Sequence, residues 1–332
     1  MRKPSRINRQ AGRHALVDGI PFTLPVAGHR TPALMVAFPI NAAKAAALLP
    51  GNELHPMVVF GNTGVLLITV VDYIDTNIGR YIEFSIGIGC THGTRPAPPL
   101  LPLLPILSDH YQMGQYVFDL PVSTDISVKG GKGIWGMPKH KANLDFRIEE
   151  TTVSSQYDLD GQLCMRITMD RTRPWLPVTS SAINFCEFRG LLMKSSIYFK
   201  GKVGLSLFKK GQTELLIGDH PRVARLKSLE IGDKPLATIF FPSAEGVLDD
   251  HFESWFVSSD EPPTSQPEGF ESVIDLPLDE EWLPAPSAAG RTPDRPGEHA
   301  QPAEAAPPLV SPPHAPEPAA ASDGALPDTG AA

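Results

Sequence analysis

The pattern of apolar positions along the chain predicts a protein built mainly from β-strands. Between residues 33 and 241, short runs of β-branched, aromatic and other apolar residues recur, and each run is bounded by Gly, Asn, Asp or Pro. Runs of this kind, separated by turn-forming residues, are typical of successive antiparallel strands. The predicted strands are residues 33–39, 64–73, 80–89, 115–120, 142–148, 151–159, 163–170, 196–207 and 236–241.

Two segments have the features of short helices. Residues 41–49 read NAAKAAALL and end at a Pro-Gly pair, and residues 221–229 begin with a proline, which helices accept in their first turn. The chain shows many strands, few helices and no alternation of strands with helices. We therefore predict a mainly β (α+β) fold, an antiparallel sheet curled into a cone-like barrel with a few helices outside it.

The composition changes near the C-terminal end of the 332-residue chain. From Pro262 onward there are 16 of the 35 prolines, many alanines and no lysine. Such a segment cannot bury enough apolar surface to offset its ordering entropy. We predict a flexible basic N-terminus over residues 1–19, a globular domain over 20–258, and a Pro/Ala-rich segment over 259–332 that is disordered from about residue 284. Residues 269–283, which include Phe270, Ile274 and Trp282, could dock loosely or bind an unidentified partner, and a solvated tail without a specific role is the alternative.

Charge and cysteine usage narrow the class of protein. The net charge is −8 and no basic stripe occurs, so we expect no nucleic-acid partner. No apolar segment follows the basic N-terminus as in a signal peptide, and the longest apolar run, residues 97–107, is too short and proline-broken to span a bilayer. The three cysteines are widely spaced and form no C-x-x-C pair. We predict a cytoplasmic protein without membrane contact.

One glycine-rich segment matches a known motif without its usual context. Residues 131–136, GKGIWG, satisfy G-x-G-x-x-G. However, Pro138 prevents a helix from starting there, and no acidic residue closes a second strand of a dinucleotide site. We expect these glycines to form a sharp turn that carries Trp135 and Lys139 inward. The histidines are scattered, so we predict neither a metal site nor a cofactor.

Lys139 is the candidate for chemistry. It follows Met137 and a proline, and His140 and Lys141 come directly after it. Lowering a lysine pKa from about 10.4 to the 7–8 at which enzymes use it requires roughly 3–5 kcal/mol. Burial and a neighbouring positive charge both act in that direction. Trp135 and Met137 are candidates for an apolar wall, and Lys141 or protonated His140 for the charge; a solvated loop lysine is the alternative.

The run over residues 114–139, GQYVFDLPVSTDISVKGGKGIWGMPK, resembles the core of the acetoacetate decarboxylase family. That family has a short helix followed by glycine, an apolar or aromatic residue, proline and the Schiff-base lysine. The resemblance extends over about residues 20–255. Upstream, Tyr81-Ile82-Glu83 matches a family strand with an active-site Glu, and Arg30 falls where the family has an active-site Arg.

The resemblance implies a homo-oligomeric enzyme with Lys139 in an apolar cavity of a cone-like barrel. Lys139 would form an imine with a β-keto acid such as acetoacetate, and the imine would accept the electrons released as CO₂ departs. Glu83 would handle protons. Arg30 would hold a substrate carboxylate or fix Glu83, as the geometry of its guanidinium favours.

Two departures from the family keep other functions open. His140 stands where the decarboxylases have a second lysine, and Thr69 falls where they have a second glutamate. The same lysine serves aldol condensation and dehydration of 2-oxo acids in some relatives of this family. The open alternatives are therefore an aldolase-dehydratase and a non-catalytic barrel that binds a small molecule.

Overall fold

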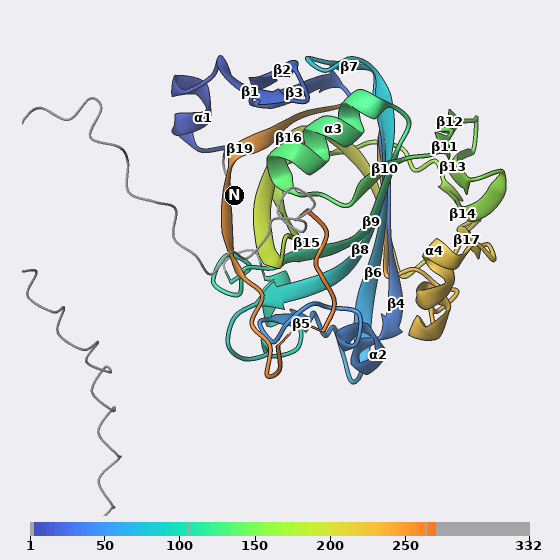
Figure 1. Cartoon of the computed structure of the whole chain (residues 1–332). Coiled ribbons are helices and arrows are strands. Elements are labelled where there is room, and N and C mark those ends of the chain that lie inside the picture. Colours follow the sequence, from blue (N-terminus) through green and yellow to red (C-terminus); the bar gives the residue numbers. More distant parts are fainter. Residues whose placement is uncertain (1–2, 105–106, 263, 270–332) are drawn as a thin grey trace, which may run out of the picture. The chain divides into compact units, whose positions relative to one another are not determined.

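The structure is a computed structural model that describes residues 3–104, 107–262 and 264–269. Three β-sheets form the frame of this part of the chain (Figure 1). A two-stranded sheet holds β1 (Arg13–Val17) and β2 (Ile20–Leu24). A five-stranded sheet holds β11 (Asn143–Leu144), β12 (Arg147–Ile148), β13 (Thr152–Leu159), β14 (Gln162–Asp170) and β17 (Glu214–Ile217). The largest sheet has twelve strands: β3 (Val26–Arg30), β4 (Ala33–Asn41), β5 (Leu54–Pro56), β6 (Thr63–Tyr73), β7 (Asp75–Thr76), β8 (Tyr81–His92), β9 (Gly114–Val122), β10 (Lys139–Lys141), β15 (Leu176–Phe188), β16 (Leu191–Leu207), β18 (Ala237–Phe241) and β19 (Ala244–Phe256). The predicted mainly β fold with few helices is confirmed.

Seven strands of the largest sheet are joined in a closed circuit of pairings. From β9 the order runs through β8, β6, β4, β18, β16 and β15, and β15 returns to β9 through the pairs Asn184–Gln115 and Phe185–Tyr116. β16 also pairs with β19, from which β3 and β7 continue as a branch. A closed circuit is what a barrel requires; the cone-like barrel itself stays a prediction.

Two pairings of this sheet are parallel, which the sequence pattern did not predict. β10 lies parallel to β9 and is connected to it through α3 (Asp125–Trp135), and β15 also runs parallel to β9. The chain therefore contains one strand–helix–strand unit, where we expected none. The residue pattern missed α3 because it contains Gly130, Gly131 and Gly133. Each glycine costs a helix interior about 1 kcal/mol relative to alanine, so such a sequence reads as a turn.

The strands β4, β6 and β8 present two different faces. Their even-numbered apolar residues, such as Val36, Ile68 and Ile86, are buried in the main core against β13, β14 and the short helices. Their odd-numbered residues, such as Thr69 and Glu83, line a cavity on the other side. Because side chains alternate along a strand, one strand pattern supplies both the core and the cavity wall.

The short helices follow the sequence signals. α2 (Ala42–Ala46) begins after Asn41, whose side chain accepts a hydrogen bond from the backbone N–H of Lys44. α4 (Pro221–Ala224) continues as the 3₁₀ helix η2 (Arg225–Leu229), and η1 (Leu101–Leu103) is a further 3₁₀ turn. Both predicted helical segments are thus confirmed, although the regular α-helix in each is shorter than predicted.

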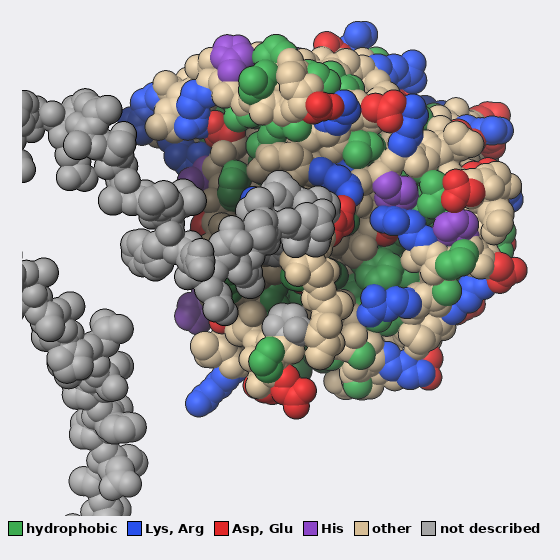
Figure 2. All heavy atoms as spheres, viewed as in Figure 1, with side chains coloured by type: hydrophobic (Ala, Val, Ile, Leu, Met, Phe, Trp, Pro, Cys, Tyr) green, Lys and Arg blue, Asp and Glu red, His purple; other side chains and the backbone are tan. Residues whose placement is uncertain are grey.

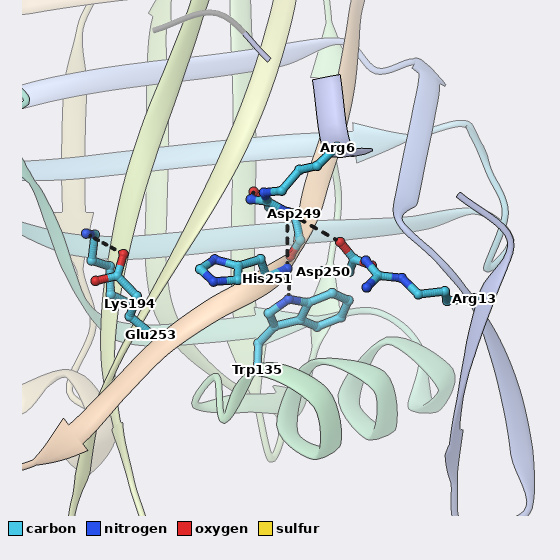
Figure 3. A network of polar contacts seen from close by, with 8 residues as sticks. All are labelled: Arg6, Arg13, Trp135, Lys194, Asp249, Asp250, His251 and Glu253. Carbon is cyan, nitrogen blue, oxygen red and sulfur yellow. Dashed lines mark hydrogen bonds and ion pairs between the residues drawn. The ribbon is translucent and has the colours of Figure 1, made fainter. Parts of the chain in front are cut away.

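The N-terminal segment takes regular structure, where the sequence predicted a flexible basic terminus. It forms α1 (Ser5–Arg9) and β1, and Ile7 is buried. Arg6 donates from Nη1 to Oδ1 of Asp249 at 2.8 Å, and Arg13 pairs with Asp250 (Figure 3). The basic residues near the N-terminus therefore face two acidic residues of β19, a long-range pairing that local sequence does not reveal.

The described part of the C-terminal segment returns to the sheet. Glu268 pairs with Lys132 of α3, and its carbonyl accepts a hydrogen bond from the backbone N–H of Arg189 at 3.0 Å. The predicted disorder from about residue 284, and the apolar side chains of residues 270–283, lie outside the described residues. The predicted domain boundaries stay predictions.

Charges of both signs cover the face shown in Figure 2. Lysine and arginine side chains there are interspersed with aspartate and glutamate, and histidines lie among them. Among the described residues, no helix combines the length and the apolar character that crossing a membrane requires.

Candidate active site

A helix end and a short strand place Lys139. α3 stops at Gly136, whose φ of 64° is the left-handed conformation that glycine adopts without steric cost. The chain turns there, and Lys139 begins β10. We expected the glycines of this segment to form the turn together. Only Gly136 does so, because Gly131 and Gly133 lie within α3.

Gly131 makes room for the lysine side chain. A Cβ atom built on Gly131 would lie 2.3 Å from Cδ of Lys139 and 2.7 Å from Cε, which is closer than real Cβ contacts. The aliphatic part of Lys139 therefore packs directly on the bare backbone of α3. Any side chain at residue 131 would move the amine.

Trp135 fixes the end of α3 to β19. Its indole Nε1 donates to the backbone oxygen of Asp249 at 2.8 Å, and its side chain is buried (Figure 3). The sequence predicted Trp135 and Met137 as the apolar wall beside the lysine. Met137 lines the cavity together with Lys139. Trp135 is not among the lining residues and instead holds the end of α3 against β19.

Lys139 lines a cavity of about 160 Å³. An apolar protein cavity of about 150 Å³ holds a benzene molecule, so this space suits a small organic ligand. Lys139 and Glu83 are the charged side chains among the described residues that line it. The polar lining residues are Thr31, Thr69, Tyr73, Thr76, Tyr81, Ser85, Gln115 and Asn184, and the remaining walls are apolar or glycine.

Lys139 and Glu83 form an ion pair inside this cavity. Nζ of Lys139 lies 2.7 Å from Oε2 of Glu83, and the two side chains are 5% and 16% exposed. Nζ also donates to Oγ of Ser127 at 3.0 Å and lies 5.3 Å from the centre of the Tyr81 ring. The amine and the carboxylate are within the distance over which a proton is transferred.

Two tyrosines connect Ser127 with Glu83 by a second path. The rings of Tyr73 and Tyr81 are stacked with centres 4.5 Å apart, and the Tyr73 hydroxyl donates to Oε1 of Glu83 at 3.5 Å. Burial raises the pKa of both phenols well above the usual value, while a hydrogen bond with Ser127 lowers the pKa of Tyr81 and one with Tyr81 lowers the pKa of Tyr73. Because both phenols stay protonated at neutral pH, a continuous series of donors leads from Lys139 to the carboxylate.

Arg30 lies outside the cavity, in contrast to the expected role. Its side chain is 70% exposed, and Nε lies 3.9 Å from Oδ2 of Asp75. Gly28, two residues earlier in β3, does line the cavity. The pairing of β3 with β7 shifts register between Gly28 and Arg30, and such an irregularity redirects the following side chains.

His140 and Lys141 do not place a positive charge beside Lys139. His140 faces the opposite side of the sheet, where Nε2 lies 3.0 Å from the hydroxyl of Tyr157, and burial lowers its pKa. Lys141 is 58% exposed and pairs with Asp125 at 2.6 Å. The expectation that a cationic neighbour acts on Lys139 therefore has no support in the positions of these two residues.

Several residues near Lys139 were not singled out from the sequence. Alternation along the strand of Glu83 points to Tyr81 and Ser85, which share its face and line the cavity. Ser127 carried no such signal because the residue pattern did not predict α3. Gln115 lines the cavity beside Asn184, its pairing partner on β15, a strand that the pattern also missed.

Among the described residues, no three His, Cys, Asp or Glu side chains are grouped so as to hold a metal ion. The three cysteines are free and buried, and burial raises the pKa of the Cys186 thiol to about 12. This thiol is therefore a packing group at neutral pH.

The sequence also matches a known protein family. The sequence model of the family described as Acetoacetate decarboxylase (ADC) matches residues 8–189, more than half of the chain. The chain belongs to the acetoacetate decarboxylase family. The matched part includes Glu83 and Lys139, which the structure pairs, and Arg30, which it places apart.

Two solved acetoacetate decarboxylase structures show the same fold. Acetoacetate decarboxylase from Legionella pneumophila is 15% identical with a TM-score of 0.51, and the match covers 69% of this chain and 89% of that chain. An acetoacetate decarboxylase described under "Structural Studies of Acetoacetate Decarboxylase" is 13% identical with a TM-score of 0.51, covering 70% and 89%. The enduracididine biosynthesis enzyme MppR, in complex with the condensation product of pyruvate and imidazole 4-carboxaldehyde, is 14% identical with a TM-score of 0.48, covering 71% and 91%. No curated protein is a significant sequence match.

Proposed function

We propose that this protein is an imine-forming enzyme that decarboxylates a β-keto acid, with Lys139 as the nucleophile. The observation that carries the proposal is the position of the amine. Nζ of Lys139 is buried in a mostly apolar cavity of ligand size and lies 2.7 Å from a carboxylate oxygen of Glu83. A buried lysine and a carboxylate that border a cavity are the arrangement expected of a reacting lysine rather than of a packing contact.

The chemistry uses side chains alone and requires no cofactor. Glu83 takes a proton from the amine, the amine adds to the substrate ketone, and Glu83 gives the proton back to the carbinol oxygen, which leaves as water. The C–C bond to the carboxylate then breaks, CO₂ leaves, and the electron pair moves into the protonated imine to give an enamine. Glu83 takes up a second proton from solvent and gives it to the enamine carbon, and hydrolysis of the imine releases the ketone and Lys139.

The charge in the cavity supports loss of CO₂. With Arg30 outside, the described lining residues include no cation besides Lys139, so a substrate carboxylate meets mostly apolar walls. A carboxylate desolvated without a counter-ion is destabilised, and its charge is dispersed as the electrons move into the imine. The energetic cost of burying the carboxylate is relieved as the reaction proceeds.

An aldolase-dehydratase acting on 2-oxo acids is the second candidate. The same cavity continues beyond Lys139 to Gln115 and Asn184, which leaves room for a second reactant next to an enamine. Such an enzyme would form the same imine with Lys139. It would then add an aldehyde to the enamine carbon and eliminate water instead of releasing CO₂.

Borohydride trapping tests the proposal. The protein is incubated with acetoacetate, a longer 3-oxo acid or pyruvate, reduced, and digested, and the mass shift is located by peptide mapping. We expect an adduct on Lys139 that is absent from Lys139→Met. An adduct with release of CO₂ supports the decarboxylase, and condensation with an added aldehyde supports the aldolase-dehydratase. Failure of every oxo acid to give an adduct on Lys139 would leave the non-catalytic binding protein.

Homo-oligomerisation and a cytoplasmic location stay predictions.

A further inference from the structure

Ser127 contacts the Lys139 amine from within the wall of the cavity. Its Oγ accepts a hydrogen bond from Nζ at 3.0 Å, and the residue is only 1% exposed. Lys139 and Glu83 are among the described residues that line the cavity, whereas Ser127 is not. The N–H that Ser127 receives therefore points away from the cavity.

One face of α3 brings this hydroxyl to the amine. Ser127 and Gly131 are four residues apart in α3, and residues with this spacing share one face of a helix. A Cβ atom on Gly131 would overlap Cδ of Lys139, so the aliphatic part of the lysine passes directly over Gly131. The amine then reaches Ser127 one turn nearer the start of the helix. The contact between serine and amine is thus built into the packing of α3 on β10.

The Ser127 hydroxyl is itself held in one orientation. Burial raises the pKa of Tyr81 well above its usual value, and a hydrogen bond with Ser127 acts in the opposite direction. A hydrogen bond that favours the phenolate is one donated to its oxygen, so Ser127 is the donor. A serine hydroxyl has a single O–H to donate and accepts with its lone pairs. With that O–H directed at Tyr81, the lone pairs of Oγ are left for the amine of Lys139.

Formation of an imine changes what the lysine nitrogen can donate. The ammonium has three N–H groups, and it serves Oγ of Ser127 and Oε2 of Glu83 together. A protonated imine keeps one N–H, which lies in a plane with Cε and the imine carbon. That single N–H can be donated to the serine or to the carboxylate, and the choice decides the direction of the imine carbon.

The serine is the better acceptor for decarboxylation. A neutral hydroxyl is a weak base and leaves the proton on the nitrogen, where it is needed for the imine to accept the electrons released with CO₂. A carboxylate competes for that proton and offsets the positive charge of the imine. Glu83 is also required at the carbinol oxygen and at the enamine carbon in the proposed reaction.

We propose that Ser127 is a positioning residue that accepts the N–H of the Lys139 imine and so directs the imine carbon into the cavity. The three substituents of the planar nitrogen point apart. With the N–H directed into the wall, the bound substrate therefore lies on the opposite side, in the cavity that Glu83 also lines. Glu83 is then free to transfer protons to and from the substrate. That the nitrogen becomes an imine rests on the proposed function.

Borohydride trapping and CO₂ release, measured on the same 3-oxo acid, test this role. The mass of the reduced adduct on Lys139 separates the substrate imine, which retains the carboxylate, from the imine of the product. The rate of CO₂ release divided by the amount of substrate imine does not depend on the fraction of protein that is folded. In Ser127→Ala we expect this ratio to fall by about tenfold to a hundredfold, the usual effect of losing a hydrogen bond to a charged group.

Three further variants control the measurement. Ser127→Thr keeps the oxygen and should retain most of the ratio. Ser127→Cys, whose sulfur is a weak acceptor, should fall between threonine and alanine, and it decides the test where the alanine variant does not fold. Ser155→Ala removes the hydroxyl of an equally buried serine on β13, whose Oγ donates to the backbone oxygen of Asp145 at 2.7 Å. This change should leave the ratio as in the wild-type protein.

The outcomes separate this inference from the proposed function. An unchanged ratio in Ser127→Ala, or an equal loss in Ser155→Ala, overturns the role of Ser127 and leaves the proposed function standing. A parallel loss of imine and of CO₂ release keeps the ratio constant and has the same meaning, because a purely structural role lowers both together. Absence of any adduct on Lys139 in the wild-type protein overturns the proposed function and this inference with it.

Discussion

Two clusters of polar residues lie on opposite sides of β9 and β10, and they differ in what surrounds them. On one side Lys139 and Glu83 border a cavity. On the other side the carboxylate of Asp119 accepts from Arg222 at 2.8 Å and from Tyr157 at 3.2 Å, within packed side chains. Both clusters join a cation to a buried carboxylate. The Lys139–Glu83 pair is a candidate site because it borders space that a ligand can fill, whereas Arg222 is 39% exposed and its pair with Asp119 joins two parts of the fold.

The adjacent residues Lys139 and His140 illustrate the same division. They are neighbours on one short strand, and the alternation of side chains sends them to opposite clusters. Lys139 enters the cavity, whereas His140 lies beside Asp119 and Tyr157. We therefore expect substitutions in the first cluster to change reactivity and those in the second to change stability.

The largest effect is expected from removing the amine. Lys139→Met should reduce turnover of any accepted keto acid to the uncatalysed rate, because no other described lysine lines the cavity. The matched control is Lys141→Met, which makes the same change at an exposed ion pair. That control should alter turnover by less than about twofold. Equal losses in the two variants, measured by CO₂ release, would contradict the comparison.

Substitutions in the second cluster should lower the stability of the folded protein. Asp119→Asn leaves Arg222 without its carboxylate, and we expect the free energy of unfolding to fall by about 2–3 kcal/mol. Because Asp119 faces away from the cavity, the fraction of folded protein trapped on Lys139 should stay the same. Urea unfolding and borohydride trapping measure the two quantities. An unchanged unfolding midpoint would show that the network has no structural role.

The position of the amine is tested by crowding the helix beneath it. In Gly131→Ala the new Cβ competes with Cδ of Lys139, and we expect about a hundredfold loss of turnover, the usual effect of a displacement near 1 Å. In Gly133→Ala the new Cβ would instead meet Val17 of β1 at 2.6 Å. That variant should lose stability while it retains reactivity per folded molecule. A reversal of these two results would place Lys139 elsewhere.

The smallest effect is the pH dependence contributed by His140. Burial lowers its pKa in the folded protein below the ordinary value of 6.5, so the unfolded chain binds the proton first as the pH falls. The free energy of unfolding should therefore decrease as the pH drops below about 6.5, and the decrease should level off below the folded-state pKa. His140→Gln should remove this part of the dependence in urea titrations between pH 7 and pH 5. An identical pH slope in the variant would contradict the assignment.

The sequence predicts the strands best where one face is continuously apolar. The strands that became β4, β6 and β8 alternate cleanly, and their predicted positions agree with the structure. β15 and β19 were missed because polar residues interrupt them, as in the run DDHFES of β19. Their pairing with β16 compensates for this weak local pattern.

For the candidate site, the sequence revealed the lysine and its carboxylate but not their surroundings. The Met-Pro-Lys segment and the strand of Glu83 were recognised by resemblance to the family, and the structure brings the two together. Arg30 was misplaced because a register shift in β3, which no residue pattern reveals, turns it outward. His140 and Lys141 were assigned to the lysine by nearness in sequence, whereas the strand sends them away from it.

The hydrogen bond between Trp135 and Asp249 has a consequence for the synthesis of this protein. It ties the helix before Lys139 to a residue 114 positions later in the chain, and Asp249 is held in turn by Arg6, 243 positions earlier. A nascent chain therefore cannot complete this anchor until β19 has left the ribosome, long after the lysine has emerged. Contacts of such separation form late in folding. The helix before Lys139 would thus stay unanchored through most of translation and become fixed only when α1 and α3 meet β19.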